Sequence, residues 1–287
     1  MPGSGDRLAV AITGASGRMG GELVDAATRR DDIGFVLAAS RTPELVPSGD
    51  APGAPDAVVA DADLGGALDE YDVDAVVDFT VPESSVDYLR AAADAGVAAV
   101  VGTTGYEDEG RAALDAVADR VPLLKASNFS RGVAALRRAV RATVPALDGY
   151  DVEVTETHHN GKRDAPSGTA LTLLDDVDEA RGDGDGGAAD ADGADRVHGR
   201  VGEQPRTGDE IGVHARRAGN VTGEHEILLA GNDEVVELTH RAGSRGIFAA
   251  GALDAAVWLA GRDPGRYDFD AVLTPDGDGG SDGETTR

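Results

Sequence analysis

Short apolar runs, each followed by a turn and often by a helical pattern, fill the N-terminal half of this chain of 287 residues. Their lengths are typical of buried strands. Strands are predicted over 8–12, 34–40, 75–80, 98–101 and 121–125, and helices over 22–30, 84–95 and 108–119. Strands that alternate with helices form parallel sheets, because a helix supplies the crossover between two parallel strands. The pattern therefore predicts an α/β fold with a Rossmann-like, doubly wound parallel sheet.

The pattern changes near residue 128, which indicates a second domain. The elements predicted beyond it are helices over 132–144 and 170–179, a half-exposed strand over 151–156, strands over 211–215, 223–229 and 234–240, and an apolar helix over 247–260. These strands predict an α+β domain with a mixed sheet. We expect residues 1–128 and 242–287 to form a dinucleotide-binding domain and residues 129–241 a substrate-binding and oligomerisation domain. Residues 181–195 read as a flexible loop and residues 275–287 as a disordered tail.

The composition excludes several classes of function. The net charge is −27, from 53 acidic and 26 basic residues, and such a field repels nucleic acid and anionic membranes. No apolar run reaches the roughly 18 residues of a membrane-spanning helix. The chain has no cysteine, which excludes disulfides and thiolate metal sites. A cytoplasmic enzyme fits these observations, and we interpret the acidic excess as adaptation to a salt-rich cytoplasm.

Three glycines follow the first predicted strand in the spacing GxxGxxG, at Gly14, Gly17 and Gly20. Glycine permits a tight turn and lets the backbone approach a pyrophosphate at a helix N-terminus. Arg18 adds a positive charge to this turn. An ordinary strand-to-helix turn is the alternative interpretation. The position of the glycines inside a strand–helix–strand pattern favours a dinucleotide site.

Further candidate turns lie at the carboxyl ends of other predicted strands, at 78–80, 102–105 and 126–130, and each could also be only a tight turn. In open α/β sheets, ligands bind in the crevice at the carboxyl ends of the strands, so these turns are expected to face one ligand. The second strand ends in Ser40 and Arg41, without the acidic residue that suits the ribose 2′-hydroxyl of NAD. Arg41 therefore favours NADPH, although a plain surface charge is an alternative interpretation.

The run from residue 156 to residue 170 combines proton-transfer groups with an anion site. It holds His158, His159 and Lys162, and the only other lysine of the chain is Lys125. Arginine keeps its proton near neutral pH, so a lysine retained beside two histidines indicates proton transfer. Ser167-Gly168-Thr169 reads as a helix N-terminus, where backbone N–H groups attract anions. A surface loop with chance histidines is the less favoured alternative.

The remaining histidines carry weaker signals. We favour a structural role for His225 over a role in the site, whereas the two interpretations of His240 are equally good. His198 and His214 are expected to be structural or exposed. No metal site is expected, because adjacent histidines rarely bind one ion together and no further ligand follows at zinc spacing.

These motifs together resemble the 4-hydroxy-tetrahydrodipicolinate reductase (dihydrodipicolinate reductase) family, over nearly the whole chain. The most specific stretch is His158-His159-x-x-Lys162-x-Asp164-Ala165-Pro166-Ser167-Gly168-Thr169. The resemblance implies hydride transfer from NADPH or NADH to C4 of a small cyclic dicarboxylate in diaminopimelate and lysine biosynthesis. It also implies a homotetramer. Ser40 departs from the acidic residue of many members.

The resemblance also implies roles for individual residues. His158 is the implied acid–base residue and Lys162 the proton donor, and His159, Gly168 and Thr169 contact the substrate. The implied cofactor contacts are Gly14, Ala15, Ser16, Gly17, Arg18, Met19, Arg41, Gly102, Thr103, Thr104, Ala126, Ser127, Asn128 and Phe129. Two rivals remain, a related amino-acid dehydrogenase and a non-catalytic NADP-sensing protein.

Overall fold

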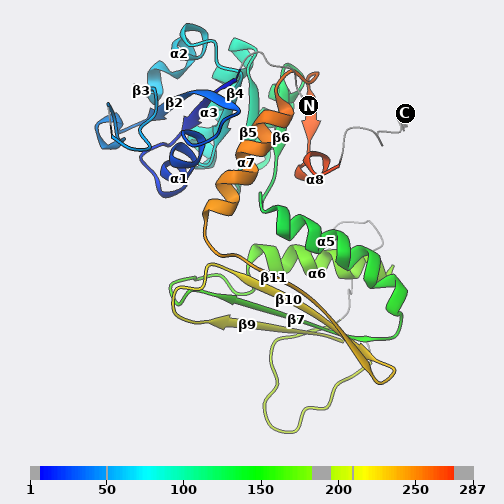
Figure 1. Cartoon of the computed structure of the whole chain (residues 1–287). Helices are drawn as coiled ribbons and strands as arrows, with labels where there is room; N and C mark the ends of the chain where they lie inside the picture. The colour runs from blue at the N-terminus through cyan, green and yellow to red at the C-terminus, as the bar shows by residue number, and fades with distance from the viewer. Residues whose placement is uncertain (1–6, 50, 183–194, 209, 275–287) are drawn as a thin grey trace, which may run out of the picture. The chain divides into compact units, whose positions relative to one another are not determined.

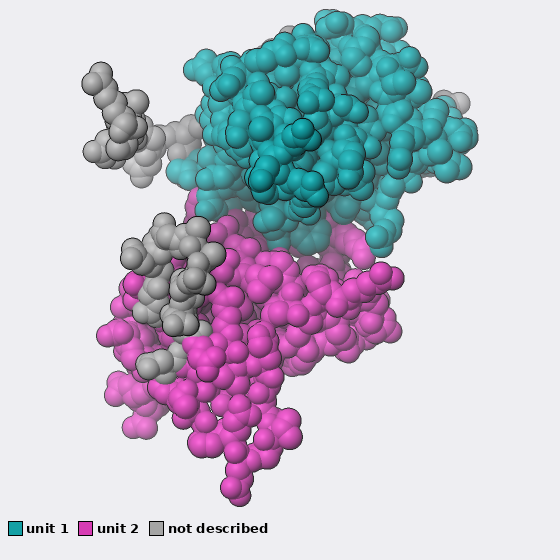
Figure 2. Space-filling model, turned by 180° about the vertical axis from the view of Figure 1, so that it is seen from behind, with its two compact units in different colours: residues 1–129, 248–287 teal, residues 130–247 magenta. Residues whose placement is uncertain are grey.

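The structure, a computed structural model, describes residues 7–49, 51–182, 195–208 and 210–274. It contains two compact units, residues 1–129 with 248–287 and residues 130–247 (Figure 2). The first unit is built on a parallel sheet and the second on a mixed sheet (Figure 1). The fold class predicted from the sequence is therefore confirmed.

The sheet of the first unit has seven strands, all paired in parallel. The strands are β1 (Leu8–Thr13), β2 (Ile33–Ser40), β3 (Ala57–Ala60), β4 (Ala75–Asp78), β5 (Ala98–Val101), β6 (Pro122–Lys125) and β12 (Gly265–Tyr267). Their order is β12-β6-β5-β4-β1-β2-β3. The chain thus leaves β1 first toward β2 and β3 and later toward β4, so the strand order reverses between β1 and β4, where such sheets bind ligands.

Helices cover both faces of this sheet. They are α1 (Arg18–Ala27), α2 (Leu64–Glu70), α3 (Pro82–Ala95), α4 (Asp108–Ala118), α7 (Gly246–Leu259) and the short α8 (Phe269–Val272), with 3-10 turns at Pro43–Leu45 and Asp61–Asp63. Apolar residues of α2, α3 and α4 pack in two clusters against one face. The ion pair Arg30–Asp254, 2.7 Å, joins the segment after α1 to α7. Successive strand residues face opposite sides, which explains why the strands are almost wholly apolar.

The glycines of the first turn explain where α1 begins. The sequence predicted a helix from residue 22, whereas α1 begins at Arg18 and ends at Ala27. A side chain at Gly20 would collide with the carbonyl oxygen of Gly14. Gly20 therefore lies inside the helix, despite its low helical propensity, because only glycine allows the helix to approach the strand end so closely.

The second unit places two helices on one face of a five-stranded sheet (Figure 1). The strands are β7 (Asp151–His158), β8 (Asp195–Val197), β9 (Glu210–Arg217), β10 (Glu224–Gly231) and β11 (Glu234–Arg241), and the helices are α5 (Arg131–Thr143) and α6 (Gly168–Arg181), with a 3-10 turn at Pro145–Leu147. The sheet order is β11-β10-β7-β9-β8. Strand β10 is antiparallel to β7 and β11, whereas β9 is parallel to β7 and β8. The sheet is therefore mixed, as predicted.

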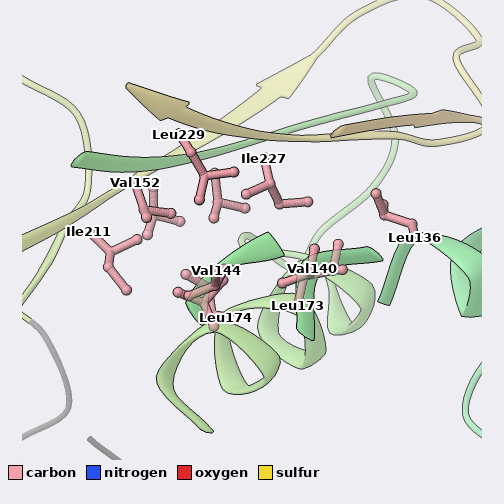
Figure 3. Packing of buried hydrophobic residues seen from close by; sticks show 12 residues of the cluster. Leu136, Val140, Val144, Val152, Leu173, Leu174, Ile211, Ile227 and Leu229 are labelled. Atoms are coloured by element: carbon pink, nitrogen blue, oxygen red, sulfur yellow. The ribbon is translucent and has the colours of Figure 1, made fainter. Parts of the chain in front are cut away.

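Apolar side chains of α5 and α6 interdigitate with the inner face of this sheet (Figure 3). Val140, Leu173 and Leu174 contribute from the helices, and Ile227 and Leu229 from β10; all five are fully buried. Burial of each large aliphatic side chain contributes about 1.5–3 kcal/mol. This cluster fixes both helices on the sheet and so fixes the positions at which the helices begin.

A buried carboxylate joins the two helices as well. Asp176 of α6 is 2% exposed and accepts hydrogen bonds from Arg137 of α5, at 2.6 and 2.9 Å, and from Arg141, at 3.3 Å. Charged pairs that are taken out of water need such complete hydrogen bonding. The hydrogen bonds of Asp176 therefore require that α5 and α6 are aligned as they are in this fold.

Parts of two predicted segments lie outside the described residues. Of the predicted loop 181–195, Arg181 ends α6 and Asp195 begins β8, and residues 183–194 are not described. The predicted tail 275–287 is also outside the described residues. Within the described part of the chain, no helix is long and apolar enough to cross a membrane.

Candidate active site

The glycine turn of the first unit forms a cradle that side chains would fill. Gly14 has φ +62°, and a side chain there would meet Thr80 Cγ2 at 2.6 Å. The N–H of Gly17 donates to the Gly14 carbonyl at 2.8 Å, which closes the turn directly before α1. Gly17 is the N-cap of α1, and no side chain caps this helix. The first-turn N–H groups therefore suit an anion such as a pyrophosphate, and the residues present fit a dinucleotide.

Hydroxyl groups gather where β2 ends. Ser16 Oγ lies 2.7 Å from Ser40 Oγ and 3.0 Å from Thr42 Oγ1, and Ser40 is buried. Arg41, between these residues, is exposed. The described residues 40–42 include no carboxylate, and Arg41 is the charged residue among them.

A buried carboxylate organises the turns at the ends of β1, β4 and β5. Asp78 is fully buried and accepts hydrogen bonds from the hydroxyls of Thr13 (2.6 Å), Thr80 (2.7 Å), Ser85 (2.6 Å) and Thr103 (2.6 Å). Thr103 Oγ1 also accepts from the N–H of Thr80 at 2.8 Å. The sequence placed Asp78 in a turn but gave no sign of this hydroxyl cage. The Thr103 hydroxyl is bonded to Asp78 and Thr80, so any contact of Thr103 with a ligand would come from its backbone.

The other predicted cofactor residues divide into core and surface positions. Phe129 is 1% exposed and packs between the rings of Phe79 and Phe269, with centroids 5.3 and 5.2 Å away. A side chain at Gly102 would collide with the Phe79 ring. Arg18, Thr104 and Ser127 are exposed, Ala15 is buried, and Ser16 is exposed. Met19, Ala126 and Asn128 are half-buried.

In the second unit, His158 is the last residue of β7 and is held by a buried carboxylate. Its Nδ1 lies 2.5 Å from Glu156 Oε2, and Glu156 is 1% exposed. Strand β7 was predicted to be half exposed, and Glu156 lies on its buried side, the side of Val152 and Val154. A short contact with an ionised carboxylate requires a proton on Nδ1. Proton exchange with a ligand is therefore left to Nε2.

Glycine keeps space beside that second nitrogen. A side chain at Gly223 would come within 3.1 Å of His158 Nε2. This distance is closer than ordinary van der Waals contact, so any larger residue at 223 would crowd His158 Nε2.

Lys162 lies in a tight turn directly after β7. Its N–H donates to the His159 carbonyl at 3.1 Å, and its Nζ pairs with Asp164 Oδ2 at 2.8 Å. The hydrogen bond from Lys162 lowers the pKa of the Asp164 carboxyl. The Lys162 side chain is 21% exposed, and His159 is half-buried. The Lys162 side chain is thus held at this turn within reach of solvent.

Helix α6 begins close to His158, because its N-cap residue, Ser167, is hydrogen-bonded to Glu156, and Glu156 contacts His158. The Ser167 N–H donates to Glu156 Oε1 at 3.2 Å, and Ser167 Oγ accepts from the Ala170 N–H at 3.2 Å as the N-cap. Gly168 is exposed and Thr169 half-buried. The predicted helix start at 170 is therefore two residues late, and the predicted anion cradle occupies the first turn of α6.

His225 joins this cluster, although the sequence favoured a structural role. Its Nε2 lies 3.2 Å from Ser167 Oγ, and its ring packs edge-on against the His158 ring with centroids 5.3 Å apart. Burial, reinforced by the charge of His158, lowers the pKa of His225 to about 4, so its imidazole is neutral. His225 thus supports the helix cap and the His158 ring together.

His240 occupies the equivalent place beside α5. It lies opposite His225 in the β10–β11 pairing, and its Nε2 is 3.4 Å from Ser130 Oγ, the N-cap of α5. Burial lowers the pKa of His240 as well. By contrast, His198 is exposed, and His214 pairs with Glu153 at 2.6 Å on the same strands as His158. Among the described residues, no group of three or more metal-ligating side chains is placed to hold a metal ion.

The sequence did not identify Glu156 as the partner of His158, or Ser167 and Arg217 as the partners of Glu156. Glu156 and Ser167 stand inside the run that the sequence singled out, so their polar type was the available signal. Arg217 is 59 positions along the chain from His158 and opposite it in the pairing of β7 with β9, and no local pattern indicated it.

Two family models match the chain, one in each half. "Dihydrodipicolinate reductase, N-terminus" matches residues 8–129, and "Dihydrodipicolinate reductase, C-terminus" matches residues 132–273. Together they span nearly all of the described chain.

Named relatives and a solved structure agree with these models. The 4-hydroxy-tetrahydrodipicolinate reductase of Natronomonas pharaonis is 53% identical over 264 residues, which cover 92% of this chain and 99% of the relative. That of Haloarcula marismortui is 49% identical over 265 residues, covering 92% and 98%. The structure of dipicolinate-bound dihydrodipicolinate reductase from Paenisporosarcina sp. TG-14 has a TM-score of 0.73 at 22% identity, covers 92% of this chain and 98% of its own, and supports the fold. The chain is therefore an oxidoreductase and belongs to the dihydrodipicolinate reductase family.

Proposed function

We propose that this protein reduces 4-hydroxy-tetrahydrodipicolinate to tetrahydrodipicolinate in diaminopimelate and lysine biosynthesis, with loss of water. The names of the relatives support the overall reaction. The observation that carries the proposal is the arrangement at the end of β7, where a carboxylate-held histidine, a lysine and a helix N-terminus lie together. This combination suits proton transfer to an anionic substrate.

His158 acts as the acid–base residue in this proposal. When bound, the nicotinamide would supply a hydride to C4 of the conjugated ring that remains after the 4-hydroxyl group is lost as water, and a proton neutralises the negative charge left on the ring. His158 Nδ1 is occupied by Glu156, so this acid–base residue exchanges protons at the site through Nε2, and Lys162 supplies the proton that the reduced ring takes up. Gly223 leaves space for the substrate beside Nε2.

Lys162 is the proposed proton donor. Its ammonium also stabilises the negative charge that develops on the substrate after hydride addition. Asp164 holds the ammonium at the turn before transfer. Arginine at this position would keep the charge but could not give up a proton near neutral pH.

The substrate carboxylates meet the first turn of α6. We propose that His159 and the backbone N–H groups of Gly168 and Thr169 hold one carboxylate. The positive end of the helix dipole and the Lys162 charge together favour a dianion locally, against the repulsion of a net charge of −27.

The first unit is proposed to bind the cofactor, NADPH in preference to NADH. Support comes from the N-terminus of α1, which no side chain caps, and from the exposed Arg41, which follows Ser40 in the chain where β2 ends. The backbones of 14–19, 102–104 and 126–129 are the proposed contacts. An engineered D-amino acid dehydrogenase of similar fold, with a TM-score of 0.50 at 16% identity, was solved with NADP+.

The remaining proposals concern the protein in its cell. We propose a cytoplasmic homotetramer whose acidic surface is adapted to high salt. A protein that folds stably at low salt and does not change up to molar salt would contradict the adaptation.

The test is substrate-dependent oxidation of reduced nicotinamide, measured by absorbance in high salt. The substrate is made in situ from the aldehyde and pyruvate by the preceding synthase, and NADPH and NADH are compared. Oxidation that needs this substrate is expected, and it should fall strongly in Lys162→Ala. Turnover of Lys162→Ala equal to wild type would refute the donor role. A folded protein that binds NADPH without oxidising it would favour the sensor or an amino-acid dehydrogenase.

A further inference from the structure

We infer that Arg217 and Glu156 are positioning residues for His158, forming a buried charge pair that fixes the proton on His158 Nδ1 and ties this histidine to the turn that carries Lys162. The inference rests on the proposed function of His158 and Lys162, and it adds two residues that contact neither substrate nor cofactor in that proposal.

Glu156 is surrounded by donors on both oxygens. Arg217 Nη1 donates to Oε2 at 2.9 Å and Nη2 donates to Oε1 at 2.8 Å, in the two-point geometry that guanidinium and carboxylate groups favour. His158 Nδ1 completes the set at Oε2 and the Ser167 N–H at Oε1. Every direction in which this carboxylate accepts a hydrogen bond is therefore filled by the protein.

The ionised state of Glu156 follows from these donors. Burial alone would raise the pKa of the Glu156 carboxyl, but the hydrogen bonds from Arg217 and His158 outweigh it and bring the pKa below its ordinary value. An ionised carboxylate accepts and never donates, so it enforces one tautomer of the imidazole. A neutral amide at 156 could donate to Nδ1 and enforce the opposite tautomer.

Arg217 also reaches the turn that holds the lysine. Its Nη2 donates to the Asp164 carbonyl at 2.6 Å, and the Asp164 carboxylate pairs with Lys162. The Arg217 guanidinium thus connects Glu156, which contacts His158, with Asp164, which pairs with Lys162. The sheet fixes this connection, because Arg217 lies directly opposite His158 in the β7–β9 register.

The charged groups facing His158 come from four segments. Glu156 lies on β7 and Arg217 on β9, His225 packs edge-on from β10, and Lys162 follows in the turn. His225 is neutral, as its lowered pKa shows. Glu156 is therefore the negative group in contact with the His158 ring.

The same two strands offer a matched control. Glu153 of β7 contacts His214 of β9 at 2.6 Å, so it also forms a carboxylate–histidine pair, and arginines 200 and 206 surround it. This pair has no contact with His158 or Lys162 among the described interactions. Glu153→Gln removes a comparable carboxylate from a comparable histidine away from the site.

The first experiment reads the tautomer directly, by ¹⁵N NMR of histidine-labelled protein. Wild type should show His158 with its neutral-state proton on Nδ1, and Glu156→Gln should shift it toward Nε2, whereas Glu153→Gln should leave it unchanged. A wild-type His158 protonated on Nε2 would overturn the inference, whether or not the enzyme is active. This readout stays decisive if wild type fails to reduce the proposed substrate, which would refute the proposed function alone.

The second experiment uses turnover. Glu156→Gln should lower kcat roughly 10- to 100-fold, the usual effect of removing a partner of a working histidine, with a much smaller change in KM. The alkaline limb of its kcat–pH profile should move to lower pH, because the imidazolium loses its negative neighbour. Arg217→Lys should lose less activity than Arg217→Met. Equal kcat and an unmoved profile in folded Glu156→Gln would overturn the inference; if that variant does not fold, the comparison of Arg217→Lys with Arg217→Met decides in the same way.

Discussion

Replacing Asp176 by Asn should destabilise the second unit by about 2–3 kcal/mol. Asp176 is 2% exposed and accepts three hydrogen bonds from two arginines that are themselves 31% and 33% exposed. Breaking a fully buried ion pair typically costs about 3–5 kcal/mol. We place the cost below that range because water can still solvate both guanidinium groups after the change.

Amide hydrogen exchange over α5 and α6 is the appropriate measurement, since it reports the local opening of this unit separately from the rest of the chain. The expected cost corresponds to exchange roughly 30- to 150-fold faster, at about 1.4 kcal/mol per tenfold.

Asp175→Asn is the matched control on the same helix, because Asp175 is 71% exposed and pairs with Arg196 at 3.3 Å. An exposed pair contributes about 0–1 kcal/mol, so the control should change exchange little. The Asp176 effect should persist in high salt, because salt screens buried pairs weakly. Exchange within twofold of wild type in Asp176→Asn would refute the argument and show that desolvation cancels the pair.

Three further predictions concern cofactor binding and pH. Gly20→Ala should abolish or strongly weaken nicotinamide binding, measured by calorimetry, because the new methyl collides with the Gly14 carbonyl and displaces the turn; unchanged affinity would show that the helix can shift freely. Arg41→Glu should lower the NADPH-to-NADH ratio of kcat/KM, since a carboxylate repels a 2′-phosphate, and a constant ratio would assign Arg41 to the surface alone. His225 is neutral in the fold with a pKa of about 4 against 6.5 in the unfolded chain, so the unfolded state takes up the proton first as pH falls. Up to about 3 kcal/mol should be lost between pH 6.5 and 4; hydrogen exchange of β10 should follow this decline, and His225→Gln should flatten it.

The sequence was a reliable guide where a single segment carries the signal. Each main strand of the parallel sheet is a continuous apolar run, because helices cover both faces, and periodicity alone identifies such runs. Elements with weak local signals were missed. Strand β3 is only Ala57–Ala60 and half-buried, β12 has three residues, and α2 contains two glycines. These elements depend on tertiary contacts: β3 and β12 pair with β2 and β6, and α2 packs with α3 in one apolar cluster.

The candidate site divides in the same way. The run from His158 to Thr169 was readable, because its chemistry is concentrated in twelve consecutive residues. The pairing of Glu156 with Arg217 was not readable, because it depends on the register of two strands that are distant in the chain. The hydroxyl cage of Asp78 likewise draws on residues from four segments. Local sequence gives residue types, and only the tertiary fold decides which of them meet.

The two serine-capped helices of the second unit have a consequence for how such a chain can evolve. Ser130 and Ser167 place the first turns of α5 and α6 over neighbouring histidines of the sheet, so two helix dipoles present their positive ends to the same region. Much of the attraction for an anion is thereby built from peptide groups, which no substitution of side chains removes. The surface can accumulate carboxylates and lose lysines while both helix ends keep their orientation toward the proposed substrate site. Net charge and the proposed anion binding can therefore change largely independently of each other.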